Sequence, residues 1–484
     1  MSSNDIPTPA GNRGTRWPLI AVLALALVLR LIEARGVRLW FDEIYIVLVG
    51  RMSIPDIVRT AAADIHPPLH FIVRHLWQSI GGEGDRWLKL LSIGFGLVAI
   101  AFTEALGRRA ISPRAGLLAA FLSALCPAHI NVSQIVDVHP MLWALATFNT
   151  WAAWRYVGER QARHALALGI GATIALYSHY LAIPLSVALA LWGAAMLARD
   201  PRALARWLLL WLAVTAAFVP QAAVFVTQFH REGNGGFFTF PTAHGLFSLA
   251  RAIGFGSYVA PPLFALACVA AWTDRRHRAI ATLLSLLVVL TVPSTRWWAF
   301  VVTRDMLVVM PFAYLLVTLG LERLPGRLAH AVASLLLVAL AAREWHHHER
   351  FPEPLQLARA EQLIAEKAKP GDIVLHAETH SLLFFRYYQP QRRNLLLADP
   401  GSRVPYFDAG LVIPDAWLTT PVAWTAARDS GLDWWGVRVD RAYTTRGHST
   451  RAGARNAAEF DSLDHDHHWH FKPVEVWHDV DAAR

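Results

Sequence analysis

Acidic side chains and a histidine lie close together in the sequence, just after the first long apolar segment. Asp42 and Glu43 are adjacent within "LWFDEIY", and Asp64 and His66 follow within "ADIHPPLHF". A carboxylate can take the proton of a hydroxyl group, and a histidine can donate a hydrogen bond to a phosphate oxygen. These residues also have a structural explanation, because acidic residues often begin helices and polar residues often occupy turns. This segment is the first candidate for chemistry, with Asp42, Glu43 and Asp64 as its candidate catalytic acids.

Further polar residues stand at the ends of apolar segments, where they can line a site. The candidates for substrate binding, besides His66, are Gln134, Asp137, His179, Tyr180, Arg296 and Arg304. An arginine is suited to an anion such as a phosphate, because its donors form a planar fork. The structural alternative is a salt bridge or headgroup contact for Arg304, interfacial packing for His179 and helix capping for Gln134 and Asp137.

The composition is that of a membrane protein. The chain has 484 residues, 55% hydrophobic and 17% charged, whereas soluble proteins carry about 25% charged residues. Its net charge of +9 comes with arginines that crowd into short loops between apolar segments. Such loops are explained by membrane orientation, so we expect the lipid bilayer as a partner and no binding of nucleic acid.

Apolar stretches near the length that a bilayer requires predict roughly eleven transmembrane helices. They lie at about 17–34, 89–106, 115–129, 139–155, 164–178, 180–198, 204–227, 258–272, 279–299, 306–321 and 328–342. We expect the first to be a retained helix and not a cleaved signal peptide, because it ends in "LRLIEARG" without a small-residue cleavage site. Residues 1–16 then form a cytoplasmic tail.

Every second loop is rich in arginine, which predicts the orientation. These loops are "GRRAISPR" (107–114), "RYVGERQAR" (155–163), "RDPRALAR" (199–206), "TDRRHR" (273–278) and "ERLPGR" (322–327). The intervening short loops at 128–139 and 177–180 contain neither arginine nor lysine. Since positive residues stay inside, we expect a multi-pass protein of the plasma (inner) membrane with a cytoplasmic N-terminus. The first loop and the C-terminal region are then exoplasmic, or periplasmic.

After Arg343 the long apolar stretches give way to short elements. "LQLARAEQLIAEKA" and "SLLFFRYYQ" predict helices, and "DIVLH", "RRNLLLAD" and "LDWWGVRVD" predict strands. The predicted fold class is therefore an α-helical polytopic membrane protein with a small C-terminal α/β domain. The transmembrane domain spans 17–342 and includes an amphipathic exoplasmic first loop at 35–88; the C-terminal domain spans 343–484.

"WFDEIY" followed by "ADIHPPLHF" closely resembles the first luminal loop of the protein O-mannosyltransferases, glycosyltransferase family 39 of the GT-C superfamily. Weaker similarity extends to the segments at 131–145, 175–185 and 303–321. The resemblance implies an inverting membrane glycosyltransferase whose sugar donor is a polyprenyl phosphate. It leaves the sugar and the acceptor open, and the acceptor can be a lipid, a glycan or a protein.

The resemblance also implies roles for residues. Asp42 occupies the position of the family's catalytic base, and Arg304 matches its late-span arginine. Glu43 either orients Asp42 or faces away from it, since adjacent side chains on a helix do not share a face. Asp64 and His66 bind either the acceptor or the surroundings of the leaving phosphate.

Two histidine-rich patches, "WHHHE" (345–349) and "HDHHWH" (465–470), raise the question of a metal. Alternate histidines on a strand share a face, but such tails often bind metal adventitiously. A divalent cation at Asp42 and Asp64 is chemically possible, and the resemblance does not call for one. We predict no metal site and no cofactor.

Two other function classes compete with the enzyme. A transporter or flippase for a glycan or lipid-linked substrate also has polar residues within the membrane. Transporters commonly carry broken helices at related positions of two halves, and no such halves are visible in this sequence. A glycan-binding scaffold without activity is the third possibility, and the complete acidic motif argues against it.

Overall fold

The computed structural model describes residues 16–33, 38–233, 278–294, 307–322, 326–327, 352–376, 379–397, 418–419, 434–439, 467–471 and 474–479. The chain divides into two compact units. The helical unit comprises Met1–Arg35, Ile65–Val73 and Arg86–His348. The loop–sheet unit comprises Gly36–Asp64, Arg74–Asp85 and Glu349–Arg484, so most of the first loop groups with the C-terminal region.

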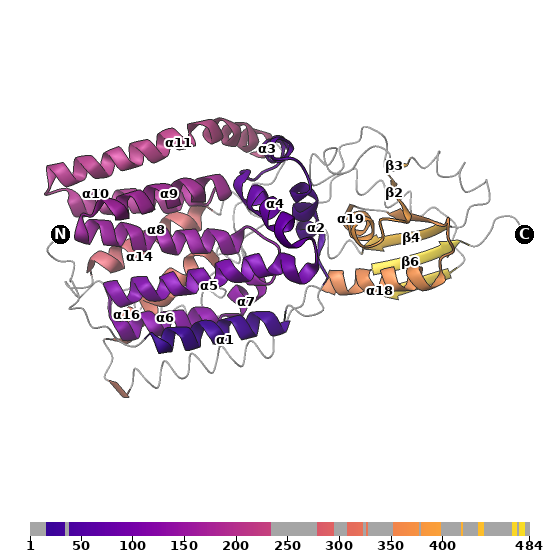
Figure 1. Ribbon diagram of the computed structural model, residues 1–484, viewed down its shortest axis with the longest axis horizontal. Helices are drawn as coiled ribbons and strands as arrows, with labels where there is room; N and C mark the ends of the chain where they lie inside the picture. The colour runs from indigo at the N-terminus through magenta and orange to yellow at the C-terminus, as the bar shows by residue number, and fades with distance from the viewer. Residues whose placement is uncertain are drawn as a thin grey trace, which may run out of the picture. The chain divides into compact units, whose positions relative to one another are not determined.

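Long helices make up the helical unit, and several run side by side (Figure 1). They are α1 (Trp17–Glu33), α5 (Asp85–Ala110), α6 (Pro113–Leu125), α7 (Pro127–Ser133), α8 (His139–Glu159), α9 (Ala162–Ser178), α10 (Ala182–Leu197), α11 (Pro201–Gly233), α14 (Arg278–Ser294), the short 3₁₀ helix η3 (Leu307–Val309) and α16 (Met310–Leu321). The helix predicted at 115–129 is divided into α6 and α7 at Pro127, because proline has no N–H with which to continue the backbone hydrogen bonds of the helix. The predicted helices at 258–272 and 328–342 lie outside the described residues.

The apolar character of these helices fits a bilayer. Among the described residues, α5 and α11 are long and apolar enough to cross a membrane, and α1, α6, α10, α14 and α16 contain shorter apolar segments. Helices α5 and α6 approach each other closely at two glycines: a Cβ on Gly107 would lie 2.7 Å from the Cα of Gly116. Small residues at such crossings are typical of helices that pack within a membrane.

Two kinds of loop lie at opposite ends of the helical unit. Arg109 forms an ion pair with Glu159, and Ser112 hydrogen-bonds to Glu322, so three arginine-rich loops meet at one end. Helix α8, whose 21 residues span about 30 Å, separates Glu159 from His139. The arginine-free loops at 128–139 and 177–180 meet at that other end, where the rings of His139 and His179 are 5.2 Å apart. This arrangement agrees with the alternation in the sequence.

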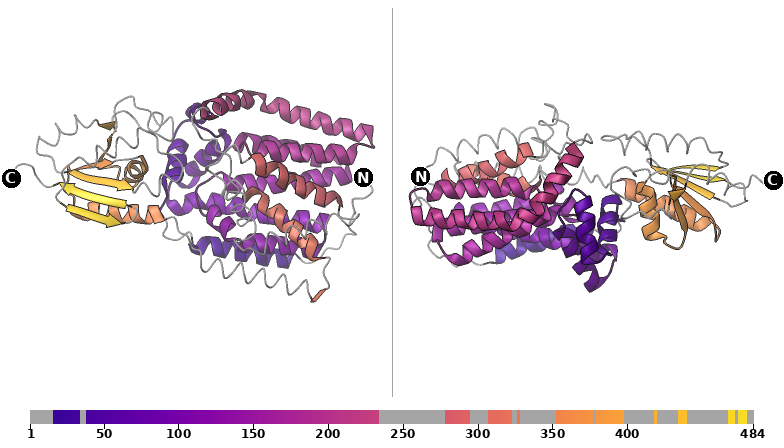
Figure 2. Two further views of the ribbon diagram at one scale, coloured as in Figure 1. Left: turned by 180° about the vertical axis from the view of Figure 1, so that it is seen from behind. Right: turned by 90° about the horizontal axis from the view of Figure 1, so that it is seen from above.

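The loop–sheet unit combines short helices with a six-stranded sheet (Figure 2). Its elements are α2 (Phe41–Gly50), α3 (Ile54–Ala63), α18 (Pro352–Lys367), β1 (Ile373–His376), α19 (Thr379–Tyr388), β2 (Arg393–Leu397), β3 (Leu418–Thr419), β4 (Trp434–Val439), β5 (His467–Phe471) and β6 (Val474–Asp479). Helix α4 (Leu69–Gly81) belongs to the helical unit up to Val73 and to this unit from Arg74. The helices and strands expected in the C-terminal region from "LQLARAEQLIAEKA" to "LDWWGVRVD" are present as α18, β1, α19, β2 and β4.

The sheet is mixed, with strand order β3-β2-β1-β4-β6-β5. Strands β1 to β4 pair in parallel, and β6 pairs antiparallel with both β4 and β5. The histidine-rich patch at 465–470 contributes most of β5, whose His470 pairs in register with Glu475 of β6.

A fully buried histidine ties β1 to its neighbours. The ring of His376 hydrogen-bonds to the Ser381 hydroxyl at 3.0 Å and to Asn394 Oδ1 at 3.2 Å. The pKa of His376 is lowered to about 3, mainly by burial; the bond to Asn394 opposes this shift, and the charge of Arg386 contributes to it. The imidazole is therefore neutral at physiological pH and stabilises the sheet as a hydrogen-bonded, uncharged group.

Candidate functional site

The first turn of α2 carries the adjacent acids Asp42 and Glu43. Asp42 is half-buried, whereas Glu43 is only 2% exposed. Glu43 Oε2 accepts a hydrogen bond from the Trp40 N–H at 3.0 Å and so caps the helix. The N-terminal turn of a helix stabilises a carboxylate anion, which is the form that a general base requires. The two acids thus differ in environment. Glu43 is buried and fixes the start of α2 through its capping bond, whereas Asp42 is more exposed.

Asp64 ends α3 and lies near a tyrosine of α2. Its N–H donates to the carbonyl of Thr60 at 2.9 Å, and the residue is 6% exposed. Burial raises the pKa of Tyr45, and the nearby Asp64 carboxylate raises it further. Because Asp42 and Tyr45 are three residues apart on α2, they share a face of the helix. Asp64 therefore lies near the face of α2 that carries Asp42.

Four histidines come together in the helical unit. The ring centroids of His66 and His70 are 5.8 Å apart, those of His66 and His179 are 5.6 Å apart, and those of His139 and His179 are 5.2 Å apart. His66 precedes α4, His70 lies in its first turn, His139 begins α8 and His179 caps the end of α9. We refer to these four residues as the histidine cluster. Since only Ile65 separates His66 from Asp64, the sequence joins the cluster directly to the acidic segment.

Hydrogen bonds orient two rings of the histidine cluster. His179 Nδ1 accepts from the Leu181 N–H at 3.1 Å, so the proton of the neutral ring is on Nε2. His139 Nδ1 lies 2.9 Å from Asp137 Oδ1, an arrangement in which the ring N–H donates to the carboxylate. The neutral His139 ring then keeps its Nε2 as an acceptor. In their neutral forms, His179 thus carries its proton on Nε2 and His139 carries its proton on Nδ1.

Two of the predicted substrate-binding residues make bonds between helices. The Tyr180 hydroxyl donates to Gln228 Oε1 and accepts from Gln221 Nε2 at 2.8 Å, which ties the end of α9 to α11. Gln134 Nε2 donates to the carbonyl of Arg30 at 2.9 Å, which ties the end of α7 to α1. These bonds fix the loops that carry His179 and His139.

The structure brings together His66, His179 and Asp137, which the sequence had singled out, with two histidines that it had not. His70 and His139 were missed, although "DVHP" and "HPPLH" place both beside candidate residues. The anion-binding candidates Arg296 and Arg304 lie outside the described residues. In the described part of the chain, no three His, Cys, Asp or Glu side chains are grouped so that they could hold a metal ion.

Comparison with known proteins places this geometry in context. Residues 65–226 match the family model of the dolichyl-phosphate-mannose-protein mannosyltransferases. This match confirms the predicted resemblance to that family; it begins at Ile65, within the first loop, and reaches into α11. No curated protein sequence matches the chain significantly.

Two solved glycosyltransferases share the architecture. ArnT from Cupriavidus metallidurans, bound to undecaprenyl phosphate, is 14% identical with a TM-score of 0.63, and the match covers 97% of this chain and 99% of ArnT. The chain has the ArnT fold. The oligosaccharyltransferase of Archaeoglobus fulgidus, in complex with zinc and sulfate, is 12% identical with a TM-score of 0.50, and the match covers 88% of this chain and 68% of that one. The ArnT match includes the C-terminal region, so the fold likeness is not confined to the helices.

Proposed function

We propose that the protein is an integral-membrane glycosyltransferase that moves a sugar from a polyprenyl-phosphate donor to an acceptor hydroxyl on the exoplasmic face. The observation that carries the proposal is the ArnT fold, found over 97% of this chain, in a relative that binds undecaprenyl phosphate. The family match at residues 65–226 begins directly after the acidic residue Asp64 and includes the histidine cluster. A shared fold alone does not define an activity, so the residues must supply the chemistry.

The acids of the first loop supply a base. In a single inverting displacement, the acceptor oxygen attacks the anomeric carbon as the bond from that carbon to the phosphate oxygen breaks. The acceptor proton passes to Asp42, and the donor leaves as polyprenyl phosphate. Asp42 suits this role because it is half-buried and lies at a helix N-terminus that stabilises its anion. Glu43 supports the base by capping the same helix.

The leaving phosphate gains negative charge as the bond breaks, and hydrogen-bond donors stabilise that charge. The Nε2–H of His179 is one such donor, and His66, at 5.6 Å from it between ring centroids, is the second. Arg304 is the cation that we assign to the phosphate from the family pattern, with Arg296 as the second candidate. No cofactor or metal enters this scheme.

Purified protein in lipid nanodiscs tests the proposal. A panel of undecaprenyl-phosphate sugars is offered together with lipid, glycan and peptide acceptors, and the release of undecaprenyl phosphate is followed. We expect release with at least one donor and its loss in Asp42→Asn. A transporter or flippase would move a lipid-linked sugar across a liposome membrane without cleaving it. Transport without release of undecaprenyl phosphate would therefore overturn the proposal.

A further inference from the structure

Two consecutive tyrosines at the end of α19 contact the two ends of the first-loop segment. The Tyr388 hydroxyl accepts a hydrogen bond from the Leu39 N–H at 2.8 Å and donates one to Asp85 Oδ2 at 2.7 Å. The neighbouring Tyr387 hydroxyl donates to the carbonyl of Glu83 at 2.9 Å. The Tyr388 hydroxyl therefore contacts both the approach to α2 and the first residue of α5, whereas the Tyr387 hydroxyl bonds to Glu83 and its ring faces Arg51 at the end of α2.

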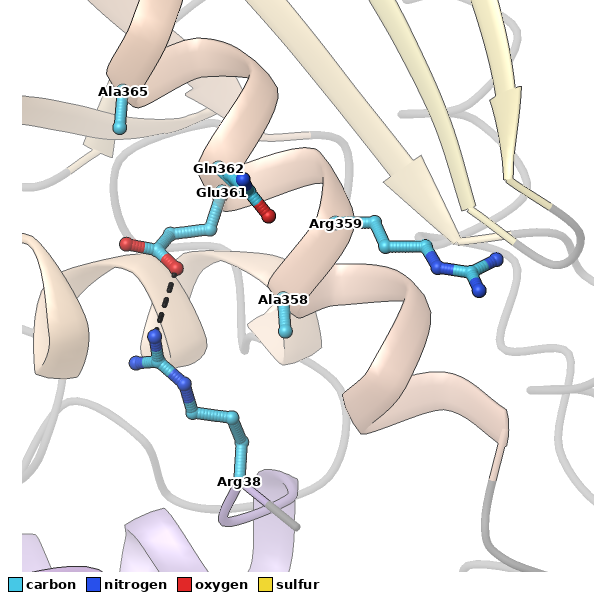
Figure 3. Close-up of a pocket in the computed structure, with 6 residues that line it drawn as sticks. All are labelled: Arg38, Ala358, Arg359, Glu361, Gln362 and Ala365. Atoms are coloured by element: carbon cyan, nitrogen blue, oxygen red, sulfur yellow. Dashed lines mark hydrogen bonds and ion pairs between the residues drawn. The ribbon is translucent and has the colours of Figure 1, made fainter. Parts of the chain in front are cut away.

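The residues just before and at the start of α2 are held from the C-terminal region at three positions. The guanidinium of Arg38 lies 4.2 Å from the centre of the Tyr388 ring. It also pairs with Glu361 of α18 at 3.3 Å, and Figure 3 draws this ion pair. The Leu39 N–H bonds to Tyr388, and the Phe41 ring lies 4.1 Å from that of His380 in α19. Chain that is contacted at three of four successive positions has little freedom to move.

The bond between Leu39 and Tyr388 is protected from water. Leu39 is fully buried, so its N–H has no solvent alternative to the tyrosine oxygen. Burial raises the pKa of Tyr388, and the carboxylate of Asp85 raises it further. The phenol thus stays protonated at physiological pH and keeps its bond to Asp85.

We infer that Tyr388 is a positioning residue that fixes the start of α2, and with it Asp42, so that the C-terminal region is part of the catalytic machinery. The inference rests on the proposed function of Asp42 as the base. Two successive backbone N–H groups are held by side chains, that of Leu39 by Tyr388 and that of Trp40 by Glu43. Asp42 follows two residues later, in the first turn of the helix. Tyr388 itself touches no substrate in this scheme.

The substitution Tyr388→Phe keeps the ring that packs against Arg38 and removes only the hydroxyl. We expect kcat to fall at least about tenfold with donor KM within about twofold, because a small displacement of a reacting group slows the chemical step. The control is Tyr387→Phe, which removes a hydroxyl with a single bond to the Glu83 carbonyl and none to Leu39. We expect this control to keep kcat within about threefold of the wild type.

The test combines hydrogen exchange of the full-length protein in nanodiscs with turnover of the undecaprenyl-phosphate sugar panel. We expect amide exchange in residues 38–43 to accelerate in Tyr388→Phe and not in Tyr387→Phe, with kcat reduced only in the former. Unchanged exchange would overturn the inference, as would faster exchange with normal kcat, or equal loss of kcat in both variants. If the wild type shows no turnover, the proposed function fails, and the exchange comparison still decides whether Tyr388 fixes this backbone.

A second variant covers the case in which Tyr388→Phe does not fold. Asp85→Ala leaves the tyrosine in place and removes the acceptor that orients its hydroxyl. We expect faster exchange at residues 38–43 and a smaller fall in kcat than in Tyr388→Phe. If neither quantity changes, the bond network around Tyr388 does not position α2.

Discussion

The adjacent acids Asp42 and Glu43 of α2 should differ in their response to substitution. Replacing Asp42 should lower the rate of sugar transfer, whereas removing the side chain of Glu43 should lower the stability of the fold. Asp42→Asn keeps the size of the side chain and its place in the first turn, but an amide cannot accept the acceptor's proton. Loss of a general base commonly lowers the rate about 10²- to 10⁴-fold, which corresponds to about 3 to 5 kcal/mol of activation free energy. Because Asp42 is half-buried and Asn is well tolerated near a helix N-terminus, we expect the free energy of unfolding of Asp42→Asn to differ from that of the wild type by less than about 1 kcal/mol.

Glu43 gives the contrasting result because of its capping bond. Glu43→Gln retains an oxygen that can accept from the Trp40 N–H, so we expect transfer within about tenfold of the wild type. Glu43→Ala removes the bond and leaves a cavity at a position only 2% exposed, and loss of a cap costs about 1 to 2 kcal/mol of stability. Asp64→Asn should fall between Asp42→Asn and Glu43→Gln in activity, because it displaces substrate without removing the base.

Single-turnover release of undecaprenyl phosphate measures the chemical step in each variant, and thermal unfolding in nanodiscs measures stability. The matched pair Asp42→Asn and Glu43→Gln differs only by one position and one methylene, so it controls for loss of a negative charge. Wild-type transfer by Asp42→Asn would refute the assignment of the base. If Asp64→Asn were then inactive, the roles of the two acids would have to be exchanged.

Three further predictions concern topology, the phosphate and the sheet. A reporter fused after Arg343 should be exoplasmic and one within 273–278 cytoplasmic, and a cytoplasmic signal after Arg343 would overturn the predicted orientation. Arg304→Ala should weaken use of the donor and Arg304→Lys restore only part of it, since a point charge lacks the fork; unchanged kcat and KM in Arg304→Ala would make Arg296 the candidate. The pKa of His376 in the folded protein is about 3, below the value of about 6.5 for a histidine in an unfolded chain. As the pH falls, the unfolded state therefore takes up a proton before the folded state does. Stability should therefore fall as pH drops from about 6.5 towards about 3, by at most about 1.4 kcal/mol per pH unit, and the same pH dependence of the unfolding midpoint in His376→Gln would contradict this.

The described helices of the helical unit were largely predictable, because apolar length is a local property of the sequence. The predicted stretch at 139–155 is α8, and that at 164–178 is α9, with ends within a few residues. The helix boundary at Pro127 was less visible, since a proline is tolerated inside many transmembrane helices. What local patterns could not reveal is that most of the first loop groups with the C-terminal region rather than with the helices that flank it.

Single candidate residues could be named from the sequence, but their grouping could be predicted only where they are close in sequence. The acids at 42, 43 and 64 were found because they form a motif, whereas the histidine cluster joins α4 to α8 and α9 across long separations. The sequence had raised helix capping as the structural alternative for Asp42 and Glu43, and the structure shows a capping bond from the Trp40 N–H to Glu43. Tyr388 carried no signal at all: it lies more than 300 positions from Asp42 in the sequence and resembles an ordinary aromatic residue of an amphipathic helix.

We propose separate roles for Asp64 and His66, which the motif alone left open between the acceptor and the phosphate. Two like unit charges 4 Å apart repel by about 4 kcal/mol at an effective dielectric constant of 20, so an ionised Asp64 beside the leaving phosphate would oppose bond breaking. A neutral imidazole carries no such penalty and offers an N–H donor. We therefore assign Asp64 to the acceptor hydroxyl, which a carboxylate binds as a hydrogen-bond acceptor, and His66 to the phosphate.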